Sequence, residues 1–95
     1  MSDPIQVSKP MLDILELLLL ANADGDEPDG WTIMRSTGRS GPAAYKVIDE
    51  LEDRKWVSGR WDENTAAGKP RRRLYVLTPD GAENARRLLG HKHTS

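Results

Sequence analysis

The chain has no cysteine and no phenylalanine, and aromatic residues occupy only 5% of its 95 positions. Without cysteine it has neither a disulfide framework nor thiolate chemistry, which fits a reducing cytosol. Its longest apolar run, Leu17–Ala21, is far shorter than the roughly 18 residues of a membrane-spanning helix. Asp3 is early and no basic segment precedes an apolar one, so no signal peptide is expected. These absences favour one small cytoplasmic domain without membrane contact.

The charges of the chain are unevenly distributed, although its net charge is only −1. Residues 1–30 contain seven acids and one base, whereas residues 54–73 contain seven bases and two acids. A local cluster sets the surrounding field as much as the total charge does, so we expect the two regions to remain separate in space. The basic region is then a functional surface. The alternative is a solvated face on which charges gather by chance.

The first predicted helix begins after Ser8, a good N-cap, with Pro10 in its first turn. Apolar residues follow at helical spacing: Met11, Ile14, Leu15, Leu18 and Leu19. Leu17 and Leu20 widen this stripe beyond the width that one core requires. Either the domain surrounds this helix, or its second face meets a partner subunit, and the sequence leaves both alternatives open.

Two further helices are predicted on either side of a short turn. Asp29 is the N-cap candidate for a helix over 31–37, which ends at Gly38, where a left-handed residue is favoured. Ser40 is the next N-cap candidate, and its helix runs to about Lys55. A helix, a short turn and a second helix make the helix-turn-helix arrangement.

Two β-patterned segments, 57–62 and 73–77, follow on either side of a loop rich in Ala, Gly, Pro and cations. Both segments mix β-branched, aromatic and long side chains. Trp61 and Tyr75 are therefore expected to pack across the strand pair. The loop is too long for a tight hairpin turn, and its charge and position predict the wing of a winged helix.

A final helix is predicted over 79–89, with Thr78 as its cap. The resulting order, α-α-α-β-β-α, predicts a mainly α fold with a small β-hairpin, the winged helix-turn-helix architecture. We predict a flexible N-terminus over 1–7, the winged domain over 8–89 and a flexible tail over 90–95.

Several strings in this order resemble those of PadR-like transcriptional regulators. The most specific is Gly68–Arg73 followed by Leu74–Gly81, in which a Gly/Pro tip and cations precede a Tyr-containing strand and Leu-Thr-x-x-Gly. Other matching strings are Gly30-Trp31, Thr37-Gly38, Ser40-Gly41, Ala44-Tyr45, Ile48-x-x-Leu51-Glu52 and Trp56-Val57. MarR-like regulators, the nearest alternative, share the Leu-Thr-x-x-Gly ending. The resemblance spans about residues 10–89. One departure is Pro42–Tyr45, where the family has Gly-Thr-hydrophobic-Tyr.

The resemblance implies a sequence-specific regulator of transcription, most often a repressor, that binds double-stranded DNA. It also implies a homodimer on a near-palindromic operator, with contacts through the first and last helices. The protein would be bacterial, archaeal or phage-encoded and would associate with the nucleoid in the cytoplasm. Some relatives bind flat aromatic compounds in a dimer pore, which implies a small aromatic effector. Many relatives continue past the wing with long dimer helices, whereas one short helix follows here.

In a helix-turn-helix, the second helix enters the major groove with its N-terminal residues. The candidate DNA-contacting residues of this segment are Arg39, Ser40, Gly41, Ala43, Tyr45 and Lys46. The small residues allow the backbone and its free N–H groups to approach a phosphate, and the Tyr45 hydroxyl can donate to another. Few of these side chains can read bases, so shape and phosphate contacts are expected to dominate. The alternative for Tyr45 is a residue at the boundary of the core.

The wing contributes four candidate DNA-contacting cations: Lys69, Arg71, Arg72 and Arg73. Because alternate side chains of a strand face opposite ways, Arg71 and Arg73 are expected on one face and Arg72 on the other. At most three of the four cations can then meet one duplex together.

Three tryptophans, Trp31, Trp56 and Trp61, are many for a chain of this length. We predict that they take the place of phenylalanine in a small core, and the alternative is that they line a ligand pocket. His91-x-His93 lacks a third metal ligand nearby. No set of catalytic side chains and no phosphate-binding loop is present, so we expect no metal, no cofactor and no enzyme.

A second class of function remains open on the sequence alone. The acidic N-terminal third and the thin polar surface of the third helix favour a winged-helix protein–protein interaction module with little or no DNA binding. Salt-dependent binding to duplex DNA would distinguish a regulator from such a module.

Overall fold

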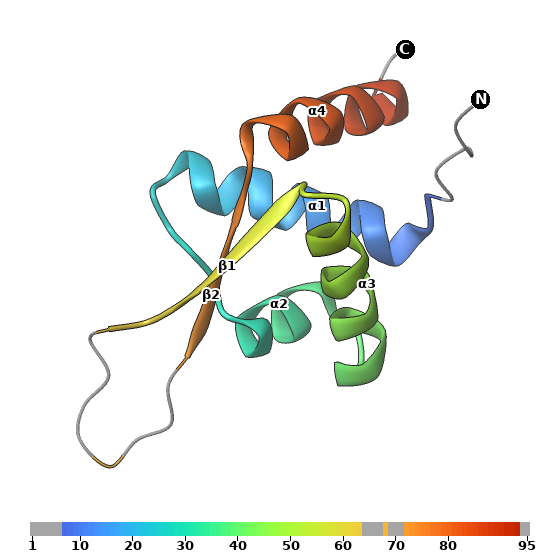
Figure 1. The fold of residues 1–95 in the computed structure, drawn as a ribbon. Coiled ribbons are helices and arrows are strands. Elements are labelled where there is room, and N and C mark those ends of the chain that lie inside the picture. The colour runs from blue at the N-terminus through green and yellow to red at the C-terminus, as the bar shows by residue number, and fades with distance from the viewer. Residues whose placement is uncertain (1–6, 64–67, 69–71, 94–95) are drawn as a thin grey trace.

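A computed structural model of the chain describes residues 7–63, 68 and 72–93, with the side chains of 91–93 outside that description. Its elements, in chain order, are α1 (Lys9–Ala23), α2 (Gly30–Thr37), α3 (Gly41–Asp53), β1 (Val57–Trp61), β2 (Arg73–Leu77) and α4 (Pro79–His93) (Figure 1). This order confirms the predicted fold class, a winged helix-turn-helix that is mainly helical with one small hairpin.

Each of the first three helices begins at a residue whose side chain caps it with a short-range hydrogen bond. Ser8, Asp29 and Ser40 each adopt an extended backbone, and each side chain accepts a hydrogen bond from the backbone N–H three residues further along. Gly38 ends α2 in the left-handed region, with φ 71°. Because caps act within one turn, the sequence located these helix ends well.

Helix α4 is longer than the sequence predicted. It continues to His93, beyond the expected end at Leu89 and into the segment predicted to be a tail. Gly90 costs a helix interior only about 1 kcal/mol relative to alanine. It would end the helix as a cap only in a left-handed conformation, and Gly90 is not among the glycines with positive φ.

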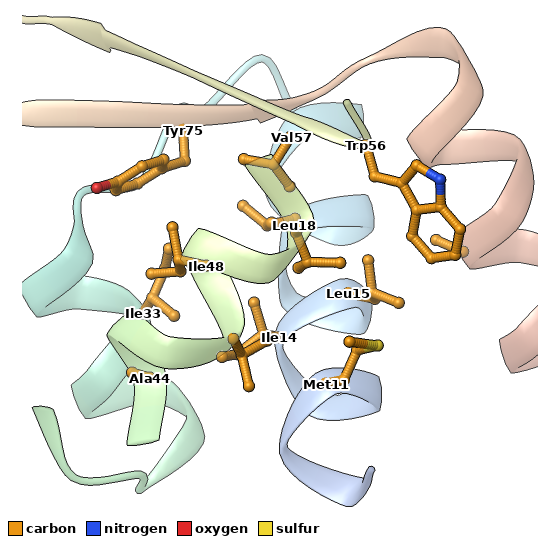
Figure 2. Close-up of a cluster of buried hydrophobic side chains, with 13 residues drawn as sticks. Met11, Ile14, Leu15, Leu18, Ile33, Ala44, Ile48, Trp56, Val57 and Tyr75 are labelled. Carbon is orange, nitrogen blue, oxygen red and sulfur yellow. The ribbon is translucent and has the colours of Figure 1, made fainter. Parts of the chain in front are cut away.

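Helix α1 lies at the centre of the domain, in contact with α2, α3, α4 and β2. Four of its apolar side chains are fully buried: Met11, Ile14, Leu15 and Leu18. Figure 2 shows them in one cluster with residues of α3 and the hairpin, with Trp56 and Tyr75 at opposite ends of the view. Leu17 and Leu19 are partly buried, whereas Leu20 is 65% exposed. The domain itself therefore covers most of the wide apolar stripe, as one of the two alternatives held.

The hairpin is antiparallel, and its register shows how Trp61 and Tyr75 lie relative to each other. Trp61 lies directly opposite Arg73, and Tyr75 lies opposite Gly59. Trp61 and Tyr75 are thus diagonal neighbours rather than a facing pair. The Arg73 guanidinium fills the space beside Gly59, where a Cβ would come within 2.7 Å of its Nε. The guanidinium lies over both aromatic rings, at 5.4 Å from the centroid of Trp61 and 5.9 Å from that of Tyr75.

The acidic linker between α1 and α2 runs beside β2. The Pro28 carbonyl accepts a hydrogen bond from the Tyr75 N–H at 2.9 Å, and Asp29 forms an isolated β-bridge with Leu74. At the start of the linker, the Asn22 side-chain oxygen accepts from the Leu77 N–H at 2.8 Å. These contacts fix the acidic residues against the base of the hairpin.

Replacing Asn22 with alanine is expected to lower the free energy of unfolding by about 1–3 kcal/mol, because the partly buried Leu77 N–H loses its acceptor. Urea denaturation followed by circular dichroism measures the change. Asn84→Ala is the matched control, since its amide donates to the exposed Asp80 carbonyl, and a shift within about 0.5 kcal/mol is expected there. Equal losses in the two variants would contradict this account of Asn22.

None of the helices in the described ranges combines the length and the apolar character that crossing a bilayer requires.

Candidate nucleic-acid interface

The first two turns of α3 present the predicted recognition surface. Ser40, Tyr45 and Lys46 are exposed, and Gly41 and Ala43 are partly exposed. The opposite side of the helix is anchored in the core by Ala44, Val47, Ile48 and Leu51. The Ser40 hydroxyl accepts the Ala43 N–H as a cap but retains its own hydrogen as a donor.

Tyr45 lies at the boundary between core and surface. Its phenol packs over the first residue of α2, and a Cβ at Gly30 would overlap the ring. The side chain is nevertheless 45% exposed. Tyr45 thus combines the two alternatives stated for it, because one side of the ring packs on the domain while the other side faces solvent.

Arg39 is held within the fold. Its guanidinium forms an ion pair with the Asp13 carboxylate of α1 at 2.5 Å, and both side chains are about three-quarters buried. This pair fixes the turn between α2 and α3 against α1. Arg39 would have to leave Asp13 in order to contact DNA, which sets it apart from the other candidate residues of this segment.

Two cations of the wing pair with acidic residues of the helix-turn-helix. Arg72 Nε lies 3.0 Å from Asp29 Oδ2, and Arg73 Nη2 lies 3.0 Å from Glu52 Oε2 of α3. The two neighbouring arginines are therefore paired with carboxylates of different elements. Lys69 and Arg71 lie outside the described residues.

A third pair joins β1 to the acidic linker, where Arg60 Nε lies 2.7 Å from Glu27 Oε1. The expectation that the acidic and basic regions stay separate in space is wrong for these residues. The linker hydrogen-bonds to β2, and that contact brings its carboxylates to the hairpin. Acids and bases that are distant in the chain thereby become partners at the base of the wing.

The ion pairs also set the pKa values of these groups. The hydrogen bond from Arg60 lowers the pKa of Glu27. Burial raises the pKa of Asp29, but hydrogen bonds from Thr32 and the charge of Arg72 outweigh it, so the net shift is downward. The hydrogen bond to Glu52 raises the pKa of Arg73. Glu27 and Asp29 are therefore ionised, and Arg73 is protonated, at neutral pH.

The tryptophans do not share one environment. Trp56 is only 6% exposed and fills the core as predicted, whereas Trp31 and Trp61 are 58% and 51% exposed. The prediction that all three replace phenylalanine in the core is therefore wrong for two of them. Burial falls along β1 from Val57 to Trp61, and Trp31 lies at the outward-facing start of α2.

Trp31 and Trp61 instead border a shallow hollow of about 370 Å³. We call it the aromatic hollow, because four aromatic side chains line it: Trp31, Tyr45, Trp61 and Tyr75. Asp29, Gly30, Arg72 and Arg73 also line it. It opens between the start of α2, the exposed side of α3 and the loop end of the two strands, where Trp61 pairs with Arg73.

Sequence reasoning missed Trp31, Trp61 and the three carboxylates as part of this surface. A signal existed for Trp31, since its spacing of two from the buried Ile33 places it off the helix's buried stripe. For Trp61 the strand alternation was misleading, because it puts Trp61 on the same face as the buried Val57. For the carboxylates, no local sequence pattern predicts an arginine partner more than twenty residues away.

A comparison with known protein families matches more than half of the chain to one of them. The model of the transcriptional regulator PadR-like family matches residues 35–87, which include α3 and the whole hairpin. No curated protein matches the chain.

Among solved structures, MepR, a transcription regulator of the Staphylococcus aureus multidrug efflux pump MepA, superposes with a TM-score of 0.75 at 19% identity over 90% of this chain. An S. aureus MepR–DNA complex superposes with a TM-score of 0.73 at 18% identity over 88% of this chain. AF1382 from Archaeoglobus fulgidus superposes with a TM-score of 0.75 at 14% identity over 94% of this chain. The chain spans 57% and 63% of the two MepR chains but 93% of AF1382. These similarities show a common fold.

Proposed function

Because the chain belongs to the PadR-like family of transcriptional regulators, we propose that it binds duplex DNA, with α3 in the major groove and the wing on the backbone or in the minor groove. One observation carries the proposal. The start of α3 and the end of β1 with the start of β2 lie toward the same side of the domain, with α2 between them (Figure 1). A groove-binding helix and a wing must meet the duplex together.

Each predicted residue receives a role in this proposal. Ser40, Gly41, Ala43, Tyr45 and Lys46 approach the groove and its flanking phosphates. Lys69, Arg71, Arg72 and Arg73 contact the backbone. Arg39, Arg72 and Arg73 contribute only after leaving their carboxylate partners. The fold similarity to the S. aureus MepR–DNA complex supports this mode of binding. Membership of a regulator family agrees with the prediction that the chain is not an enzyme.

We further propose a homodimeric repressor that acts on a near-palindromic operator in the nucleoid. Support for the dimer comes from the exposed Leu20 and the partly buried Leu17 beside it on α1. The dimer contacts would lie on α1 and α4. A small aromatic effector stays a prediction of the family resemblance; the buried Trp56 has no part in such a site.

A second candidate function is supported by a specific observation. Each hairpin arginine in the described part of the chain has a carboxylate partner: Glu27, Asp29 and Glu52. This pairing reduces the positive field of the wing and favours a winged-helix module that binds another protein.

Titration of the protein with random-sequence duplex DNA at several salt concentrations tests the choice. A regulator is expected to bind with a log–log salt slope of about −0.9 for each phosphate that a cation neutralises. Absence of binding at low salt would instead support the protein-interaction module.

Selection of bound sequences from a random duplex library then tests specificity and symmetry. A dimer is expected to enrich two inverted half-sites spaced by about one helical turn. A single unrepeated site, together with a monomeric mass by light scattering, would contradict the dimer while leaving the DNA-binding proposal in place.

A further inference from the structure

We propose that the aromatic hollow seats the sugar–phosphate backbone of one DNA strand, with Trp31 and Trp61 packing against deoxyribose rings. This inference rests on the proposed DNA binding and extends it to two residues outside the predicted recognition surface.

The first observation is the concentration of exposed aromatic surface at one place. The chain contains three tryptophans, two tyrosines and no phenylalanine, and four of these five side chains line the aromatic hollow. Two of them, Trp31 and Trp61, leave more than half of their surface in water. An indole ring is costly to expose, and its flat apolar face with one N–H donor suits a partner that is apolar on one side and polar on the other.

The second observation is the position of the hollow. Its lining comes from α2, α3 and both strands of the hairpin, the elements on either side of the path that a bound duplex must follow. DNA that touches both α3 and the wing passes over this gap. The part of a duplex presented there is the ridge between its grooves, which consists of alternating deoxyribose and phosphate.

The third observation is the charge balance of the hollow. Its cations, Arg72 and Arg73, are paired at 3.0 Å with Asp29 and Glu52. The Arg73 guanidinium also lies over the rings of Trp61 and Tyr75, and the Arg35 guanidinium lies over the ring of Trp31. Paired arginines offer little net charge for the release of counterions from DNA. Binding here therefore draws on ring contact and on hydrogen bonds from the indole N–H groups and the Tyr45 hydroxyl.

The salt dependence of DNA binding should therefore distinguish contacts made by the hollow from contacts made by cations. Contacts without counterion release change the affinity equally at all salt concentrations, and they leave the log–log slope unchanged. Loss of a cation that neutralises a phosphate changes the slope by about 0.9.

The test is a titration of wild type, Trp31→Ala, Trp61→Ala and Lys46→Ala with the same duplex over a range of salt. Each tryptophan variant is expected to bind about threefold to tenfold more weakly with the wild-type slope. Lys46→Ala, which removes an exposed cation of α3, is the matched control and is expected to flatten the slope. Circular dichroism spectra and melting temperatures near those of wild type confirm that the folds are intact.

Fluorescence gives a second readout that does not depend on the salt slope. In wild type, DNA is expected to quench the emission of the exposed indoles. In the double variant Trp31→Phe/Trp61→Phe only the buried Trp56 remains, and DNA should leave its emission unchanged.

The possible failures are distinguishable. If wild type binds duplex DNA but both alanine variants bind equally well, the inference about the hollow is overturned and the proposed function stands. A flattened slope in the tryptophan variants also overturns the inference, since it would show that the rings act by positioning a cation. If wild type binds no duplex at low salt, the proposed function and this inference fail together.

Discussion

Alanine in place of Gly81 is expected to lower the free energy of unfolding by about 3 kcal/mol or more. A Cβ at this position would lie 2.6 Å from the carbonyl carbon and 2.8 Å from the Cα of Trp56, and it would overlap the carbonyl oxygen. These are backbone atoms, which cannot rotate away as a side chain would. A small domain is stable by about 5–15 kcal/mol in total, so the variant loses a large share.

The reason for this close approach lies in the Leu-Thr-x-x-Gly string. The Thr78 N–H donates to the Trp56 carbonyl at 2.9 Å, and the Thr78 hydroxyl donates to the Lys55 carbonyl at 2.6 Å. The same hydroxyl accepts from the Gly81 N–H at 3.0 Å. The start of α4 is thereby held against the chain that enters β1, with no room for a side chain at position 81.

Guanidinium denaturation followed by circular dichroism measures this loss. Gly90→Ala is the control on the same helix, because a Cβ there meets no heavy atom within 4 Å among the described residues. That change is expected to be neutral or to stabilise the protein by up to about 1 kcal/mol. A Gly81→Ala variant as stable as wild type would show that the start of α4 moves freely.

Neutralising the three carboxylates of the hairpin pairs is expected to strengthen DNA binding at least tenfold at low salt, about 1.4 kcal/mol. The variant is Glu27→Gln/Asp29→Asn/Glu52→Gln, which removes the partners of three hairpin arginines. Each freed arginine can neutralise a phosphate, so the salt slope should steepen by up to about 0.9 per arginine. Asparagine keeps the cap of α2, because it serves as well as aspartate at an N-cap.

The same duplex titration measures this gain, with Glu83→Gln as the control. Glu83 is an exposed carboxylate of α4 whose partner is Arg87 of the same helix, so its loss changes the net charge without touching the wing. Weaker binding in the triple variant would show that the carboxylates orient the arginines for DNA rather than compete with it. Equal gains in both variants would indicate an effect of net charge alone.

The predicted order of elements and the second strand agree with the structure because their signals are short-range. The second strand lies over Arg73–Leu77, as predicted, and the first ends one residue early, at Trp61. The predicted end of α4 is less accurate, because a glycine such as Gly90 can either end a helix or lie within it, depending on its backbone conformation. Residues Lys69 and Arg71 stay predictions from the sequence alone.

The sequence by itself determined the starts of the first three helices and the turn at Gly38. Each depends on a hydrogen bond or a backbone preference within four residues. Only the tertiary structure decided which aromatic rings face water and which arginines of the wing are paired. Those properties depend on elements that meet after long separations in the chain, such as Glu27 with Arg60. The distance and angle at which such elements pack are not encoded in any short stretch of the sequence.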